Sequence, residues 1–312
     1  MKKLIRRLLF GDVVISEYST VTVNEEINEK VYLQVGKIII DVSQCQFLLC
    51  LEPVVFGVWI ENDSCYEKNN AGYKMYFKIL DTKKSNKQKT LAIVDLVFFD
   101  KIENGNKILL LLKLKTTKIY HTNFIKTHLL YNRFYKKPEL PFNKLKSFVA
   151  AYSYPRRVRI ISFKQDGYFN IFPMDLLGDI DENNHYVFGL RHTNITLSKI
   201  IETKKIVVSE VSYKYKDVIY QLGKHHGSSP PTLDTLPFKT LQSEKFGFPV
   251  PDWIYSYKEI KILKTIDLGS HRLLWGEVVN EKKFKEPTGN LYHIHFLQLL
   301  KQKSIGNSYT LV

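Results

Sequence analysis

The sequence predicts a mainly β protein with a few helices. Val, Ile, Thr, Phe and Tyr, which are enriched in strands, recur in short runs separated by polar turns. Hydrophobic residues make up 44% of the 312 residues, enough for a buried core and too many for a disordered chain. Prolines near residues 136–142 mark the best boundary, so we expect a β-rich N-terminal domain, 1–137, and a second domain, 138–312.

The N-terminal part reads as successive strands. Runs at 73–80, 90–99 and 107–117 are rich in apolar residues, and the lysine- and serine-rich stretch 82–89 between the first two reads as a loop. Asn104-Gly105 between the last two runs tolerates the positive φ angles of a tight turn, which predicts a hairpin. No catalytic pattern stands out in this part, so its role is left open.

Two helices are expected around the boundary. Apolar residues and a histidine recur at helical spacing over 121–135, at Phe124, Ile125, His128, Leu129 and Phe134. Pro138 and Pro141 end this pattern, and 143–151 reads as a second short helix.

After Pro155 the strand pattern resumes, with runs at 158–163, 168–172, 186–190, 206–211, 259–266, 273–279 and 291–296. Leu197, Ile200 and Ile201 share one face of a predicted helix that Thr193 or Thr196 can cap. Residues 227–237 carry too many prolines for a strand. Short strands with few helices favour a closed or half-closed barrel.

Charge, cysteine content and hydropathy bear on the binding partners and the cellular compartment of the protein. The net charge of +15 suits anionic partners, but the lysines are spread along the chain, which is typical of a general compositional bias. Cys45, Cys50 and Cys65 show no CxxC spacing, so we expect reduced thiols in a cytoplasmic protein. No apolar run reaches the roughly 20 residues of a membrane helix, and we expect no membrane partner.

One cluster of side chains suits an anionic group. Arg191 offers a fork of donors, and hydroxyl and amide groups follow at Thr193, Asn194, Thr196 and Ser198, just before the predicted helix. The alternative is that a threonine only caps the helix while Arg191 is a solvated strand end.

Three segments in order resemble a known family. Residues 154–178 carry Pro155-Arg156, Asp166-Gly167, Asn170 and Pro173-Met174-Asp175; residues 189–200 read GLRHTNITLSKI; and residues 267–279 read DLGSHRLLWGEVV. This series is similar to the flavin reductase-like, flavoredoxin-type family of FMN-binding split β-barrels. The resemblance covers about half of the chain, roughly 145–300, and implies a split barrel within 138–312.

The resemblance also implies roles for particular residues. The flavin ring would lie against Asn170, Pro173, Met174 and Asp175, and its phosphate would meet Arg191, Thr193, Asn194, Thr196 and Ser198. His271 stands where the family has a histidine near the nicotinamide or flavin ring, which makes it the catalytic candidate, but Ser270 replaces the usual aspartate. His226 is a further pocket candidate, with an incidental loop histidine as the alternative.

The function implied is an FMN-dependent oxidoreductase that passes a hydride from NAD(P)H to bound flavin and on to free flavin or another acceptor. FAD is the second choice of cofactor, and a homodimer is implied. One alternative is a non-catalytic flavin-binding or electron-transfer protein, which the missing aspartate suggests. Another is a nucleic-acid-binding barrel that uses the positive charge, but no compact basic and aromatic motif favours nucleic acid.

Other chemistries are not indicated. His293 and His295 alternate on one predicted strand face, but no third ligand is evident, so we expect no metal. GxGxxG, GxxxxGK[ST], HExxH and GxSxG motifs do not occur, and a Rossmann domain is not supported.

Overall fold

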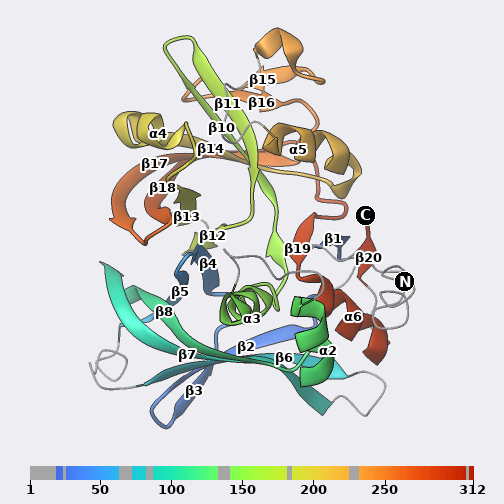
Figure 1. The fold of residues 1–312 in the computed structure, drawn as a ribbon. Helices are drawn as coiled ribbons and strands as arrows, with labels where there is room; N and C mark the ends of the chain where they lie inside the picture. Colours follow the sequence, from blue (N-terminus) through green and yellow to red (C-terminus); the bar gives the residue numbers. More distant parts are fainter. Residues whose placement is uncertain are drawn as a thin grey trace. The chain divides into compact units, whose positions relative to one another are not determined.

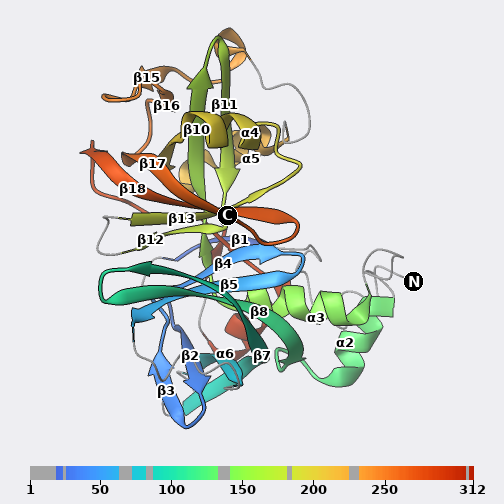
Figure 2. The same ribbon diagram turned by 90° about the vertical axis from the view of Figure 1, so that its left-hand side faces the viewer.

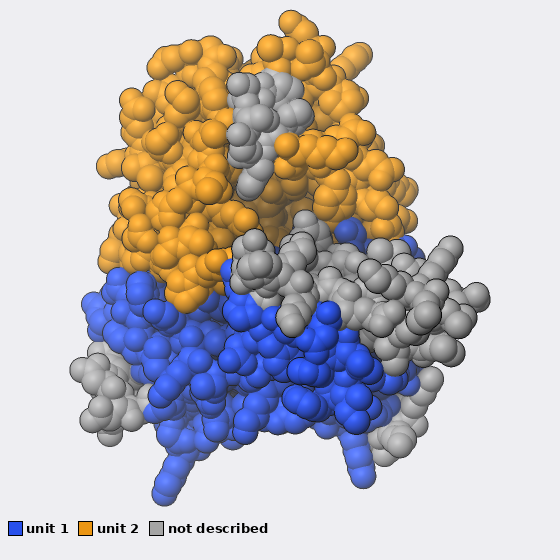
Figure 3. All heavy atoms as spheres, viewed as in Figure 1, with its two compact units in different colours: residues 1–46, 54–156, 293–311 blue, residues 47–53, 157–292, 312 orange. Residues whose placement is uncertain are grey.

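The computed structural model describes residues 19–23, 26–62, 72–81, 87–132, 141–180, 185–224, 232–306 and 309–312. Strands dominate these residues, which confirms the predicted mainly β class (Figure 1). The chain divides into two compact units (Figure 3). Unit 1 comprises residues 1–46, 54–156 and 293–311, and unit 2 comprises residues 47–53, 157–292 and 312.

These units do not coincide with the expected division at 137/138. Helix α3 (Phe142–Ala151) groups with unit 1, and the chain returns to unit 1 after residue 292. A short early segment, Phe47–Pro53, groups instead with unit 2. Prolines show where a helix or strand ends. The sequence pattern does not show that 47–53 belongs to the later unit, or 293–311 to the earlier one.

The main sheet of unit 1 is antiparallel. Its paired strands, in spatial order, are β3 (Ile38–Asp41), β2 (Glu29–Val35), β6 (Tyr73–Asp81), β7 (Lys87–Asn104), β8 (Lys107–Ile119) and β5 (Val54–Glu61). Burial alternates along β6, as expected where one face covers a core. The predicted hairpin is confirmed: β7 and β8 form it (Figure 2), and Gly105 in its turn has φ of 61°.

The helices of unit 1 differ in part from the prediction. α2 (Phe124–Leu130) begins later than the predicted stretch 121–135, and its apolar Phe124 and Ile125 are 72% and 69% exposed rather than in a core. Phe134 lies outside the described residues. α3 packs against β8. α6 (Phe296–Ile305) was not predicted, and β19 (Tyr292–Ile294) is shorter than the expected strand 291–296. The remaining short strands are β1 (Ser19–Thr22), its partner β20 (Thr310–Leu311), and β9 (Arg156–Arg157).

Unit 2 contains one seven-stranded antiparallel sheet. Its strands, in spatial order, are β11 (Tyr168–Met174), β10 (Arg159–Gln165), β14 (Lys205–Glu210), β17 (Ser256–Asp267), β18 (His271–Lys283), β13 (His185–Arg191) and β12 (Leu177–Ile180). Among the described residues the edge strands β11 and β12 do not pair with each other, so hydrogen bonds do not close the sheet into a barrel.

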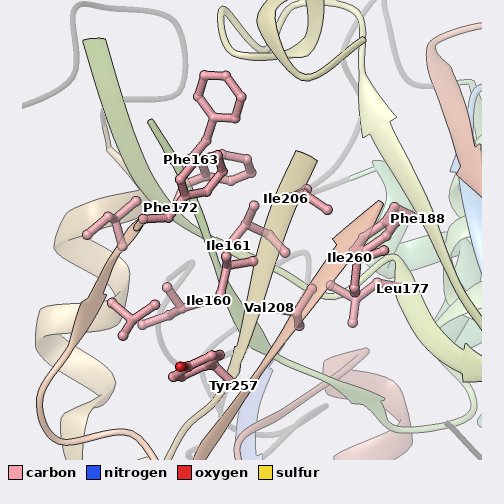
Figure 4. Packing of buried hydrophobic residues seen from close by; sticks show 14 of the residues in the cluster. Ile160, Ile161, Phe163, Phe172, Leu177, Phe188, Ile206, Val208, Tyr257 and Ile260 are labelled. Carbon is pink, nitrogen blue, oxygen red and sulfur yellow. The ribbon is translucent and has the colours of Figure 1, made fainter. Parts of the chain in front are cut away.

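The core of unit 2 lies on the sheet and is covered by helices. Phe163, Phe172, Phe188 and Ile160 belong to one buried cluster (Figure 4). Full burial of each such side chain stabilises the fold by about 1.5–3 kcal/mol. α4 (Leu197–Thr203) contacts β10 and β14, and α5 (Lys216–Gly223) contacts β11.

Short elements complete unit 2: the 3-10 helices η3 (Tyr213–Tyr215) and η4 (Leu233–Thr235), and the paired strands β15 (Thr240–Gln242) and β16 (Pro249–Pro251). Of the predicted irregular stretch 227–237, residues 227–231 lie outside the described residues.

The early segment of unit 2 lies against strand β13. β4 (Gln46–Leu51) contributes Leu49, whose carbonyl oxygen would be 1.7 Å from a Cβ atom placed on Gly189. Only a residue without a side chain permits this approach of two backbones. Gly189 is therefore required where the two segments meet.

Candidate functional site

A pocket of about 330 Å³ lies in unit 2, at the turn between β13 and α4. Three of the predicted phosphate ligands line it: Thr193, Asn194 and Ser198. The other lining residues are His192, Ile195, Leu197, Ile201 and Arg272.

Asn194 shapes the turn that forms this pocket. Its backbone N–H donates to the carbonyl of Arg191 at 3.0 Å, and its Oδ1 accepts the backbone N–H of Thr196 at 2.9 Å. A short side chain that bonds the backbone two residues on is typical of a turn that precedes a helix. Leu197, the first residue of α4, then donates its N–H to the carbonyl of Asn194 at 3.0 Å.

Two residues that line the pocket carry a side-chain donor with no hydrogen-bond partner among the described residues. Asn194 is 3% exposed, and its Nδ2 makes no hydrogen bond within the described part of the chain. Arg272 Nε is likewise buried without an acceptor there. Because a buried donor without an acceptor costs about 1–3 kcal/mol, a ligand that brings acceptor oxygens would be favoured. A phosphate group fits this donor set, with the hydroxyls of Thr193 and Ser198 beside it.

Asp267 moderates the positive charge of the pocket. Its Oδ2 is 3.0 Å from a terminal nitrogen of Arg272 and 3.3 Å from Nε2 of His192. The backbone N–H of Gly269 and the side chain of Arg272 lower the pKa of Asp267, so this carboxyl group is ionised at neutral pH. A bound phosphate would share Arg272 with Asp267.

Thr196 and Asn170 do not line the pocket. They form a buried pair, in which Asn170 Nδ2 donates to Thr196 Oγ1 at 2.7 Å, and Tyr168 Oη lies 2.9 Å from the same oxygen. The resemblance assigned Asn170 to the flavin ring and Thr196 to the phosphate, at opposite ends of the cofactor. In the structure the two side chains touch.

Arg191 and His271 lie on the other face of the sheet. They are directly opposite each other in the β13–β18 ladder, so their side chains point to the same side. Arg272 follows His271 along the strand and therefore points to the opposite face, toward the pocket. The predicted phosphate ligand Arg191 and the predicted catalytic His271 are thus together, but apart from Thr193, Asn194 and Ser198.

His271 has defined neighbours on its own face. Its Nδ1 lies 2.8 Å from Ser270 Oγ and 3.5 Å from Cys50 Sγ. Burial and the positive charge of Arg191 lower the pKa of His271 to about 4, against the opposing effect of Asp175. The imidazole is therefore neutral at pH 7. Asp175, which was predicted to contact the flavin ring, instead raises the pKa of this histidine through its negative charge.

The remaining predicted contacts are dispersed. Pro173 is opposite Ile160 in the β10–β11 ladder, and its ring lies close to Gly223 of α5. Met174 packs against the core of unit 2. His226 lies outside the described residues.

The comparisons with known proteins concern the fold. No protein-family model matches the sequence, and no curated protein matches it. Solved structures of flavin reductases, FMN-binding proteins and a flavoredoxin resemble it over about half of its length.

Three of these structures illustrate the likeness. The FMN-binding protein from Thermus thermophilus with bound p-hydroxybenzaldehyde is 18% identical, with a TM-score of 0.37 over 42% of this chain and 73% of that one. BorF, the flavin reductase component of a bacterial two-component tryptophan halogenase, is 13% identical, with a TM-score of 0.42 over 46% of this chain and 90% of that one. Flavoredoxin from Methanosarcina acetivorans is 15% identical, with a TM-score of 0.37 over 42% of this chain and 69% of that one. These identities and scores are too low to assign chemistry to this chain.

Two polar residues of the pocket were missed by the sequence analysis. Arg272 follows the predicted catalytic residue His271, and His192 follows the predicted phosphate ligand Arg191. Strand alternation at 271–272 was the available signal, because it turns neighbouring side chains to opposite faces.

The two histidines considered for a metal are buried, and His295 is the N-cap of α6 rather than a strand residue. Within the described ranges no three His, Cys, Asp or Glu side chains gather around a possible ion. The described part of the chain also contains no helix that is both long and apolar enough to cross a bilayer. Cys45 and Cys50 are free thiols, and Cys65 lies outside the described residues.

Proposed function

We propose that this chain is an FMN-dependent oxidoreductase whose pocket at residues 192–201 and Arg272 holds the phosphate of the flavin. NAD(P)H would supply the hydride, and free flavin or another small molecule would accept the electrons. The observation that carries the proposal is the pair of unpartnered donors, Asn194 Nδ2 and Arg272 Nε, beside two hydroxyl-bearing residues. The ordered sequence motifs favour flavin among phosphate-bearing cofactors.

The chain's own residues would bind and orient the cofactor. Asn194 and Arg272 donate to phosphate oxygens, and Thr193 and Ser198 add hydroxyl donors. Flavin, when bound, supplies the hydride and electron chemistry. His271 is neutral at pH 7, so it serves as a hydrogen-bond donor or acceptor and not as a fixed positive charge.

FMN and riboflavin titrations of the full chain, followed by flavin fluorescence, test this proposal. Asn194→Asp keeps the Oδ1 acceptor that bonds Thr196 but replaces the free donor with a second oxygen. We expect FMN to bind at least about tenfold more weakly, because a hydrogen bond to a charged group contributes about 1.5–3 kcal/mol. Riboflavin, which lacks the phosphate, should bind as tightly to the variant as to the native chain.

Asn106→Asp is the matched control, because it makes the same change on an exposed hairpin of unit 1. FMN affinity in this variant should be unchanged. Equal weakening by both variants, or equal weakening of FMN and riboflavin by Asn194→Asp, would place the phosphate elsewhere. A chain that retains no flavin at all would end the proposal.

A second candidate is a flavin-binding or electron-transfer protein without NAD(P)H activity. It is favoured by the position of His271 on the face of β18 that points away from the pocket. The loss of NADH or NADPH absorbance in the presence of FMN separates the two candidates: turnover supports the enzyme, and bound flavin without turnover supports the carrier. The homodimer implied by the resemblance is part of the leading proposal, and sedimentation equilibrium measures it.

A further inference from the structure

Ser270 lies at the centre of a small polar cluster at the start of β18. Its Oγ is 2.8 Å from His271 Nδ1 and 3.5 Å from Cys50 Sγ. Its backbone N–H donates to the carbonyl of Glu52 at 2.7 Å, and the backbone N–H of Glu52 donates back to Ser270 Oγ at 3.1 Å. The hydroxyl oxygen is therefore held in place by its own main chain and by that of Glu52.

The proton of the Ser270 hydroxyl has two possible acceptors. Oγ already accepts from Glu52, so its single proton points either to His271 Nδ1 or to Cys50 Sγ. A nitrogen at 2.8 Å is at the ordinary length of a strong hydrogen bond, whereas sulfur is a weak acceptor. The hydroxyl therefore donates to Nδ1.

The thiol does not compete for this role. Cys50 Sγ is 3.5 Å from the carbonyl oxygen of Leu268, which can only accept, so the thiol proton has its own acceptor. With Nδ1 of His271 an acceptor, the one proton of the neutral ring must sit on Nε2. No described residue forms a hydrogen bond with Nε2.

The charges around the ring also favour the neutral form. Burial, Arg191 and His192 lower the pKa of His271, and the carboxylates of Asp175 and Glu52 raise it by less. The ring is therefore a neutral N–H donor over the whole physiological range of pH.

We propose that Ser270 is a positioning residue that holds His271 as the neutral Nε2–H tautomer, so that the ring offers a hydrogen-bond donor to an oxygen of a bound ligand. A carboxylate in place of Ser270 would accept from Nδ1–H and leave Nε2 as an acceptor. With serine at this position Nε2 is a donor, so the ligand group that can bind it is an acceptor such as a carbonyl or an oxyanion. That this group belongs to a flavin or a nicotinamide rests on the proposed function; the tautomer does not.

Nuclear magnetic resonance of the ligand-free full chain, with 15N-labelled histidine, reads the tautomer directly. His271→Asn assigns the signals of the ring. At pH 7 the native chain should show a protonated Nε2 and an unprotonated Nδ1 for His271. A protonated Nδ1 in the native chain would overturn the proposal without any variant.

Three variants test the cause. Ser270→Ala removes the only strong donor to Nδ1 among the described residues, so the two ring nitrogens should move toward a mixture of tautomers. Ser270→Asp should move the proton to Nδ1 and raise the pKa of the ring. Cys50→Ala is the matched control and should leave the tautomer unchanged, because the thiol proton points to Leu268. A change in Cys50→Ala, or none in Ser270→Ala, would show that the hydroxyl points to sulfur.

Ligand binding gives a separate result. If the chain binds no flavin while the tautomer is as expected, the proposed function fails and the role of Ser270 stands. If flavin binds but Nδ1 is protonated, the proposed function stands and the role of Ser270 fails.

Discussion

Asn170 donates its side-chain N–H to the hydroxyl of Thr196 across 2.7 Å, within a buried part of unit 2. The pair joins β11 to the turn before α4, and Tyr168 Oη lies 2.9 Å from the same oxygen. We expect Thr196→Val to lower the free energy of unfolding by about 1–3 kcal/mol, because it leaves the Asn170 amide buried without a partner. Urea unfolding measures this loss.

Thr203→Val serves as the control for that measurement. Among the described residues the Thr203 hydroxyl bonds only the carbonyl of Lys199 within its own helix, so its loss should cost less than about 0.5 kcal/mol. Equal losses in the two variants would mean that the Asn170–Thr196 bond adds no stability.

Glu210 forms ion pairs with two arginines in unit 2. Its carboxylate pairs with Arg159, whose side chain is 8% exposed, and lies 2.7 Å from Arg157. Glu210→Gln should lower the free energy of unfolding by about 2–3 kcal/mol, because Arg159 keeps its charge in a buried position with Asp179 as its remaining carboxylate partner. Glu277→Gln, which breaks an exposed pair 3.9 Å long with Lys261, should cost less than about 1 kcal/mol. Similar denaturation midpoints for both variants would contradict the prediction.

Glu29 in unit 1 should make stability depend on pH. Tyr309, Gln298 and Gln302 all donate to its carboxyl group, but burial has the larger effect and raises its pKa to about 7. A raised folded pKa means that stability is full below the unfolded value near 4.5 and is lost as pH rises toward 7. We expect a loss of about 3 kcal/mol over this range from Glu29. Glu29→Gln should remove that part of the slope in denaturation curves measured from pH 5 to 8; an unchanged slope would show that Glu29 keeps an ordinary pKa.

His121 should act in the opposite direction at acid pH. Burial, then the charge of Lys301, lowers its pKa to about 3, and its Nε2 lies 3.1 Å from Ser153 Oγ. A histidine with a lowered folded pKa stabilises fully above the unfolded value near 6.5, and this stability is lost as pH falls. At pH 5 the loss should be about 2 kcal/mol. His121→Asn should flatten the decline between pH 6.5 and 5, whereas the same change at the exposed His128 should not.

The sequence predicted strands best where local patterns decide them. Asn104-Gly105 and the runs beside it predicted the β7–β8 hairpin, because turn chemistry and strand propensity act over a few residues. α6 was missed because the sequence analysis assigned His293 and His295 to one strand, whereas His295 accepts the N–H of Leu297 and begins a helix. α2 was placed correctly, but its apolar residues Phe124 and Ile125 are exposed, because burial depends on tertiary neighbours that spacing does not reveal.

The candidate site could be predicted only in part. Thr193, Asn194 and Ser198 were singled out because residue types that bind phosphate gather at the start of a predicted helix, and all three line the pocket. Arg191 was chosen over Arg272 because it is adjacent in sequence, but the pairing of β13 with β18 decides which arginine faces the pocket. The contacts of Ser270 with Cys50 and Glu52 span more than 200 residues of sequence, and no local pattern predicts them.

The close approach of Leu49 to Gly189 sets a limit on dissecting the chain. A fragment that begins at residue 157 would carry the whole seven-stranded sheet and yet lack Phe47–Pro53, which contribute Cys50 beside His271 and the backbone of Glu52 beside Ser270. Such a fragment would lack the Leu49 backbone that packs against Gly189 of β13. A synthetic peptide of residues 46–53, added in trans, would restore that contact.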